Sequence, residues 1–161
     1  MKRLILMHHA ATGLGYNPAP HSPLTPAGTR TATAAGQFLA GYAIDLALVA
    51  PTTYAIQTWE LACLGGARAA RVELTHWLAD TLGHQLTPLV LGLPEEASTV
   101  LLLGREPALT KVVFGLLKPL QSVFEDLPNG SFFIMTHEGQ WYNMAGAAKT
   151  ELYKYIKTPR K

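Results

Sequence analysis

The chain contains 161 residues, a length that fits one domain over residues 1–161 and allows a sizeable core. Hydrophobic residues make up 48% of it and charged residues 15%, which excludes an intrinsically disordered protein. The 13 basic and 11 acidic residues nearly balance, so the charge does not indicate a nucleic-acid partner. The one dense basic group is a short tail made of Lys154, Lys157, Arg160 and Lys161.

The N-terminal apolar run covers only Leu4–Met7 before two histidines follow. Such a run is too short for the hydrophobic region of a signal peptide or for a membrane span. We therefore expect a cytoplasmic protein without membrane insertion. A short continuous apolar run is typical of a strand that is buried on both faces of a sheet.

Turn residues and apolar runs define the remaining elements. Thr25 and Pro26 supply an N-cap and a first-turn proline for one helix, and Thr52 or Thr53 caps the next. In chain order we predict a loop over residues 10–25, a helix from Pro26 to about Gly41, a strand at Leu46–Ala50, a helix through Leu64, a short strand at Val72–Leu74, a strand at Thr99–Leu103, a helix over Ala108–Phe124, a turn at Pro128–Gly130, and strands at Ser131–Thr136 and Glu151–Ile156.

Strands that alternate with helices predict an α/β fold with three α/β/α layers. The central sheet is expected to be mostly parallel, with a C-terminal antiparallel hairpin. In such sheets, ligands bind where the carboxyl ends of strands meet helix N-termini. Three segments meet that description: His8–His9, Ala50–Tyr54 and Gly104–Arg105.

Four segments in order resemble motifs of the histidine phosphatase superfamily, the phosphoglycerate mutase-like proteins. They are Leu4–Ala10, Ser22–Gly28 with its Leu-Thr-x-x-Gly pattern, Ala50–Thr58, and Val100–Leu109 with Gly-x-Glu-Pro. Together with the closing hairpin, they are most similar to the compact phosphohistidine phosphatases of the SixA type, over nearly the whole chain. An unrelated flavodoxin-like binding domain is the other fold considered, and it would require all four matches to be chance.

The resemblance implies a phosphoryl-transfer pocket with most of its charged groups replaced. In the family, a first histidine attacks phosphorus, while two arginines and a second histidine surround the phosphoryl oxygens. His9 matches the nucleophile, whereas His8 and Tyr54 occupy the positions of the arginines and Arg105 that of the second histidine. Only one of the four groups is retained, although His8, Tyr54 and Arg105 remain the candidate phosphate-binding positions.

A rival alignment uses His137, in Met135–Gly139, as the second histidine. It would leave the family match at Gly104–Leu109 unexplained, so we favour Arg105 and interpret His137 as a surface hairpin residue.

Metal and cofactor chemistry find little support in the sequence. His8 and His9 are adjacent on a strand and are expected to point to opposite faces, so they would not chelate one metal ion together. We expect no metal and no cofactor. No residue can be assigned as the acid that protonates a leaving group.

The replaced charges predict a catalytically impaired SixA-like homologue that serves as a binding or regulatory module, or as a structural subunit of a larger assembly. The expected partners are a phosphate-like anion and a protein partner or larger complex, and the aromatic pair Trp141–Tyr142 is a candidate interface. The alternative is an active phosphatase for phosphohistidine or phosphomonoesters that uses His9 as its nucleophile.

Overall fold

The computed structural model of the chain describes residues 1–13, 18–79, 86–118 and 127–156. One six-stranded sheet, in the order β3-β2-β4-β1-β5-β6, forms its centre. The strands are β1 Lys2–His8, β2 Ile44–Val49, β3 Ala69–Leu74, β4 Thr99–Gly104, β5 Phe132–His137 and β6 Lys149–Lys154. The pairs β1–β4, β2–β4 and β2–β3 are parallel, whereas β1–β5 and β5–β6 are antiparallel.

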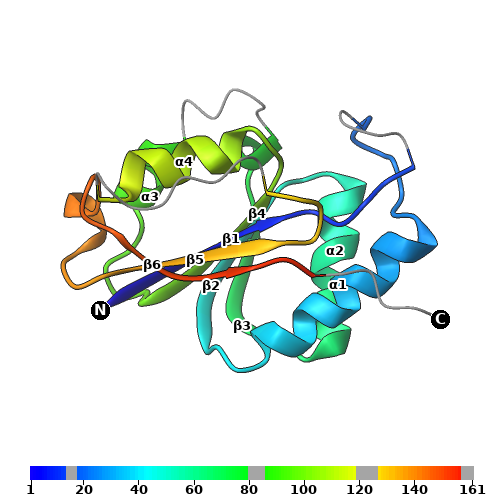
Figure 1. Cartoon of the computed structure of the whole chain (residues 1–161), viewed down its shortest axis with the longest axis horizontal. Coiled ribbons are helices and arrows are strands. Elements are labelled where there is room, and N and C mark those ends of the chain that lie inside the picture. The colour runs from blue at the N-terminus through cyan, green and yellow to red at the C-terminus, as the bar shows by residue number, and fades with distance from the viewer. Residues whose placement is uncertain (14–17, 80–85, 119–126, 157–161) are drawn as a thin grey trace.

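Helices cover both faces of this sheet, with α1 and α2 on one side and α3 and α4 on the other (Figure 1). Their bounds are α1 Pro26–Leu39, α2 Thr53–Gly65, α3 Leu86–Leu91 and α4 Ala108–Leu116, and two short 3-10 helices lie at η1 His76–Ala79 and η2 Trp141–Asn143. The expected mostly parallel sheet with helices on both faces and a C-terminal antiparallel pair is thus confirmed.

The core lies along the central strands. Leu4–Met7 of β1 and Val100–Leu103 of β4 are fully buried, because helices pack on both faces of these strands. The predicted N-caps are also present. The Thr25 hydroxyl accepts a hydrogen bond from the Gly28 amide at 2.9 Å, and the Thr52 hydroxyl accepts one from the Ala55 amide at 3.3 Å. These caps fix where α1 and α2 begin.

Several element boundaries differ from the prediction. The helix expected over Ala108–Phe124 ends at Leu116, because the chain then turns extended and the Lys118 amide donates to the Ala148 carbonyl. Residues 119–126 lie outside the described part of the chain. The strand expected at Val72–Leu74 begins at Ala69, and the one expected at Glu151–Ile156 spans Lys149–Lys154.

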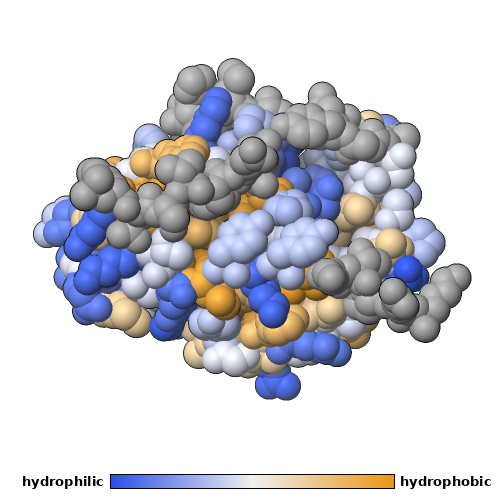
Figure 2. All heavy atoms as spheres, viewed as in Figure 1, coloured by the Kyte–Doolittle hydropathy of each residue, from blue (hydrophilic) through white to orange (hydrophobic). Residues whose placement is uncertain are grey.

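The expectation that Trp141 lies at the surface beside Tyr142 is wrong. Trp141 is fully buried, and its indole nitrogen donates to the Ala97 carbonyl at 2.8 Å, while Tyr142 is 66% exposed. Other apolar side chains stay exposed around β6, where Figure 2 shows them among charged ones. Among the helices described, none has both the length and the apolar character that a bilayer crossing needs.

Candidate functional site

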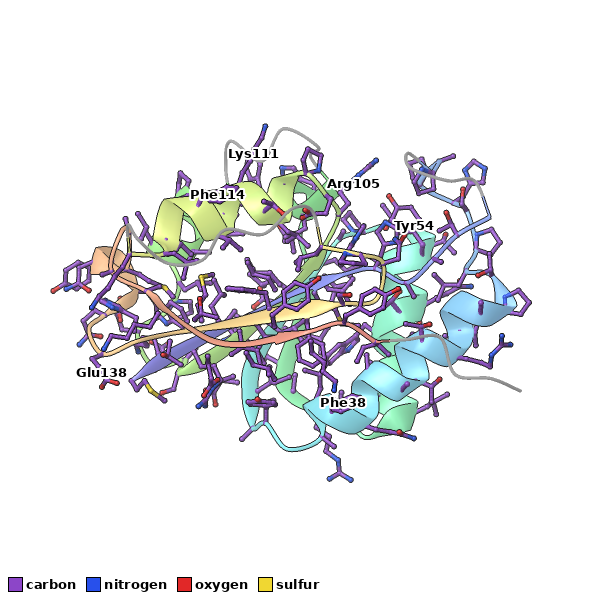
Figure 3. The ribbon with its side chains drawn as sticks, in the orientation of Figure 1. Phe38, Tyr54, Arg105, Lys111, Phe114 and Glu138 are labelled. Carbon is purple, nitrogen blue, oxygen red and sulfur yellow. The ribbon has the colours of Figure 1, made fainter. Side chains whose placement is uncertain are left out.

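The carboxyl ends of β1, β4 and β2 lie side by side at one edge of the sheet. Backbone hydrogen bonds continue one residue beyond the strands, from the His9 amide to the Gly104 carbonyl and from the Ala50 amide to the Leu103 carbonyl, both at 3.0 Å. The chain segments after these strands carry His9, Tyr54 and Arg105. Figure 3 shows Tyr54 and Arg105 at this same end of the molecule.

His9 follows the last residue of β1 and is only 3% exposed. Its Nδ1 lies 2.8 Å from the Ala10 carbonyl oxygen, which can only accept, so Nδ1 carries the proton and the lone pair is on Nε2. Burial lowers the pKa of His9 to about 3, and the positive charges of His8 and Arg105 act in the same direction. His9 is therefore a neutral imidazole at pH 7 with its basic nitrogen on Nε2.

Tyr54 comes from the first turn of α2 and packs against His9. The two ring centroids are 4.2 Å apart, and Tyr54 is 1% exposed. Its hydroxyl is buried and has no hydrogen-bond partner among the residues that the structure describes. Tyrosine thus brings a ring and one unused donor to the place where the family pattern has a guanidinium group.

His8 is held by the turn that precedes β5. Its Nδ1 donates to the Leu127 carbonyl at 2.7 Å, and its Nε2 lies 3.4 Å from the Asn129 side-chain nitrogen. The expectation that His8 and His9 point to opposite faces is wrong, because β1 ends at His8 and the two rings meet edge to face with centroids 4.6 Å apart. Even so, within the described ranges no three His, Cys, Asp or Glu residues are placed to hold a metal ion.

Arg105 directly follows β4 and is partly buried. Its charge is close enough to contribute to the lowered pKa of His9. A guanidinium group stays charged and can bind two oxygens at once, so Arg105 gives this edge a fixed positive charge. It does not replace a histidine as a proton donor, since it does not release a proton at physiological pH.

Residues of the matched motifs build the frame around these side chains. The Thr58 hydroxyl accepts from the Ala10 amide at 3.0 Å and donates to the Tyr54 carbonyl at 2.7 Å, which ties β1 to α2. The Gln57 side chain accepts from the Leu24 amide at 3.0 Å. Gly28 is required because a Cβ there would overlap the Ala11 carbonyl oxygen. These contacts hold the segments that carry His9 and Tyr54 in place.

The turn at 127–131 contacts the site, and the sequence did not predict this contact. Asn129 donates to the His9 carbonyl at 3.1 Å, and the Gly130 amide donates to the carbonyls of both His8 and His9 at 3.0 Å. Buried Glu106 accepts from the Leu127 amide at 3.1 Å and so anchors the turn next to Arg105. The turn itself was predicted from Pro128–Gly130, but its contacts are long-range and leave no local signal.

His137 lies at the opposite end of the strands from His9, beside the start of β1. It pairs in register with Lys2, at the start of β1, and its neighbour Glu138 lies at the opposite end of the molecule from Tyr54 and Arg105 (Figure 3). Its Nε2 donates to the Asn143 side-chain oxygen at 2.7 Å. The geometry therefore brings Arg105 to His9 and keeps His137 away from it.

The chain is similar to several solved structures, whereas no protein-family model and no curated protein sequence matches it. A proposed phosphohistidine phosphatase SixA from Nakamurella multipartitia is 28% identical, with a TM-score of 0.82 over 96% of each chain. The protein histidine phosphatase SixA in complex with tungstate is 20% identical, with a TM-score of 0.73 over 94% of this chain and 95% of that one. A proposed alpha-ribazole-5'-P phosphatase from Escherichia coli is 13% identical, with a TM-score of 0.78 over 99% of this chain and 100% of that one.

Proposed function

Because the chain has the fold of the SixA-type histidine phosphatases, we propose that it is a catalytically impaired relative of these enzymes. It binds a phosphate-like anion weakly and serves as a binding or regulatory module, or as a subunit of an assembly. The observation that carries this proposal is the ring of Tyr54, which packs on His9 at 4.2 Å where a phosphoryl group would need a cation.

The charge that remains at the site also supports impairment. A phosphoryl group carries negative charge that spreads over its oxygens in the transition state, so its transfer needs fixed cations and donors aimed at those oxygens. The ring nitrogens of His8 contact Leu127 and Asn129, and Tyr54 carries no guanidinium group, which leaves Arg105 as the fixed positive charge among the matched positions. Losing one such donor typically costs about 2.7–4 kcal/mol of barrier, so turnover should fall by orders of magnitude.

Weak anion binding follows from the same residues. Arg105 supplies a guanidinium group, and α2 begins with its capped N-terminus directly before Tyr54. A phosphate-like anion is bound in one similar protein, as the SixA complex with tungstate indicates. A site with one strong cation can bind such an anion and still lack the positive charge that phosphoryl transfer requires.

A combined phosphatase and binding experiment tests the proposal. We expect the protein to hydrolyse an aryl phosphate no faster than its His9→Ala variant, and to show no phosphorylated His9 by mass spectrometry after incubation with a phosphodonor. In calorimetry, tungstate should bind weakly, and Arg105→Ala should abolish the binding. The control Lys111→Ala removes a positive charge from the exposed side of α4 and should leave the binding unchanged.

An active phosphatase is the second candidate, and the state of His9 favours it. The hydrogen bond from Nδ1 to Ala10 leaves the lone pair on Nε2, as an attack on phosphorus requires. In that step the Nε2–P bond forms while the bond from phosphorus to the leaving-group oxygen breaks, and water later takes the phosphoryl group from Nε2. Robust turnover by the unmodified protein that disappears in His9→Ala would establish this candidate and overturn the proposal of impairment.

A further inference from the structure

A surface hollow of about 260 Å³ lies at the end of the strands opposite to His9. The residues that line it are Lys118, Thr136, His137, Glu138, Ala147 and Lys149. His137 pairs in register with Lys2 at the start of β1, whereas His9 follows the end of that strand. Because a strand rises about 3.3 Å per residue, about 20 Å separate the hollow from the site around His9. Figure 3 shows Glu138 at this far end of the molecule.

Backbone contacts between three segments build the hollow. Thr136 near the end of β5 pairs in register with Lys149 at the start of β6. The extended chain after α4 joins this pair, because the Lys118 amide donates to the Ala148 carbonyl at 2.9 Å. The two lysines therefore come from segments that are distant in sequence, and backbone pairing holds both of them at one hollow.

The side chains of the hollow carry an excess of positive charge. Lys118 and Lys149 stand against the carboxylate of Glu138, and all three residues are exposed. The ion pairs between described residues involve other side chains, so neither lysine is paired within that part of the chain. Two like charges at one hollow repel each other, and an anion bound between them offsets this repulsion. The electrostatics of the hollow therefore favours an anionic ligand.

The size and the donors of the hollow favour a small phosphate group. At about 260 Å³ it is smaller than the pockets of about 300–1,000 Å³ that hold drug-sized ligands. The Thr136 side chain is half-buried, and its hydroxyl can donate to a ligand oxygen. A phosphate group carries about −1.5 to −2 charges at pH 7 and three acceptor oxygens, which matches two ammonium groups and a hydroxyl donor.

We propose that this hollow is a second anion site, which binds the phosphate group of a small hydroxylated phosphate ester between Lys118 and Lys149, with Thr136 as a further donor. The Glu138 carboxylate repels the phosphate group itself but accepts a hydrogen bond from a hydroxyl group of the ester. The hollow shares no residue with the site around His9, so the proposal does not rest on the function proposed for that site.

A nuclear magnetic resonance titration tests the second site on the double variant His9→Ala and Arg105→Ala, in which neither hydrolysis nor anion binding at the first site contributes. We expect inorganic phosphate and glycerol phosphate to shift the amide signals of Thr136 and Lys149 in a saturable way at millimolar concentrations. Affinities in this range are too weak for the calorimetric titration with tungstate. Glycerol phosphate should bind more tightly than inorganic phosphate, because its hydroxyl groups can donate to Glu138.

Charge changes at the hollow should alter the affinity for inorganic phosphate in opposite directions. Lys118→Gln and Lys149→Gln should each weaken the binding by about two- to fivefold, the effect of one exposed ion pair. Glu138→Gln should tighten it by a similar factor, because a negative charge beside the anion is removed. The same change should reduce the preference for glycerol phosphate.

Lys154→Gln is the matched control. It removes the same charge from the far end of β6, where Lys154 packs over the Phe38 ring at 4.1 Å, and it should leave both affinities unchanged. The absence of saturable shifts at the hollow, or equal weakening by Lys154→Gln and Lys118→Gln, would overturn the second site. Equal affinities for the two ligands would overturn the assignment to a hydroxylated ester. Unchanged amide signals outside the hollow establish that each variant is folded.

Discussion

At the scale of the residue, the state of the His9 side chain and the groups that surround it point to different conclusions about activity. The imidazole is buried and neutral, and it is oriented by the Ala10 carbonyl, as a nucleophile at this position requires. At the positions that match the family's arginines, a tyrosine ring packs on His9 and the ring nitrogens of His8 contact Leu127 and Asn129. An intact nucleophile therefore does not by itself establish activity.

The buried state of His9 predicts an acid-sensitive stability. Its pKa is about 3 in the folded protein against 6.5 for a free side chain, so the unfolded chain binds a proton at a pH where the folded chain does not. The stability that neutral His9 provides is present above pH 6.5 and is lost as the pH falls from 6.5 to about 3. From about pH 7 to about pH 5, the free energy of unfolding should fall by about 2 kcal/mol more than in His9→Asn.

Urea unfolding of both proteins at several pH values measures this difference. The variant lacks the titrating imidazole but keeps every other ionisable group. The pH dependence that the carboxylates contribute is therefore the same in both proteins and cancels in the difference between their free energies of unfolding. Parallel pH profiles for the two proteins would show that His9 is not held in a desolvated neutral state.

At the scale of the element, the turn at 127–131 holds the first two histidines through their carbonyls, and Gly130 is its critical residue. Gly130 has φ of 79°, and a Cβ there would overlap the buried side chain of Thr31. Gly146 provides a matched control, because its φ is 68° and a Cβ there would meet nothing within 4 Å. We expect Gly146→Ala to cost about 1 kcal/mol for backbone strain alone, and Gly130→Ala about 2–4 kcal/mol because overpacking adds to the strain.

Thermal and urea unfolding of the two variants measure these costs. Similar losses at both glycines would mean that Thr31 moves aside and that the turn does not pack tightly on α1.

The same scale shows which elements the sequence could predict. Buried strands such as β1 and β4 are continuous apolar runs, and the caps Thr25 and Thr52 mark helix starts, so these elements carry local signals. The end of α4 does not, because the chain leaves the helix at Leu117 to pair with Ala148, which is distant in sequence. The predicted β3 was too short because both faces of this strand are exposed, so its sequence lacks the regular spacing of apolar residues that marks a buried strand.

At the scale of the whole molecule, the fold and the location of the site followed from four short motifs, while the contacts inside the site did not. The order of the motifs placed His9, Tyr54 and Arg105 after three strands that end at one edge. The packing of Tyr54 on His9, the contact between the two histidine rings, and the turn that holds them all join segments far apart in the chain. Such contacts follow from the assembled core and have no local sequence pattern.

The whole molecule also allows the proposed impairment to be tested, because the frame residues match the family pattern while the charged positions differ from it. Gly28, Gln57 and Thr58 make the contacts that position the segments around His9 and Tyr54. The triple variant His8→Arg, Tyr54→Arg and Arg105→His would return the family's charged groups to this frame. We expect its hydrolysis of an aryl phosphate or a phosphohistidine peptide to exceed that of the parent by at least about a hundredfold, the effect of one restored oxyanion donor.

Adding His9→Ala to the triple variant should remove the gain, because hydrolysis then lacks the nitrogen that accepts the phosphoryl group. The double variant His8→Arg and Arg105→His, which keeps Tyr54, should stay near the parent rate because the tyrosine ring still covers His9. Steady-state kinetics on all four proteins, with near-ultraviolet circular dichroism to establish folding, measures these differences. A folded triple variant without gain would contradict the proposal that replaced charges limit activity, whereas a gain that survives His9→Ala would show that His9 is not the nucleophile.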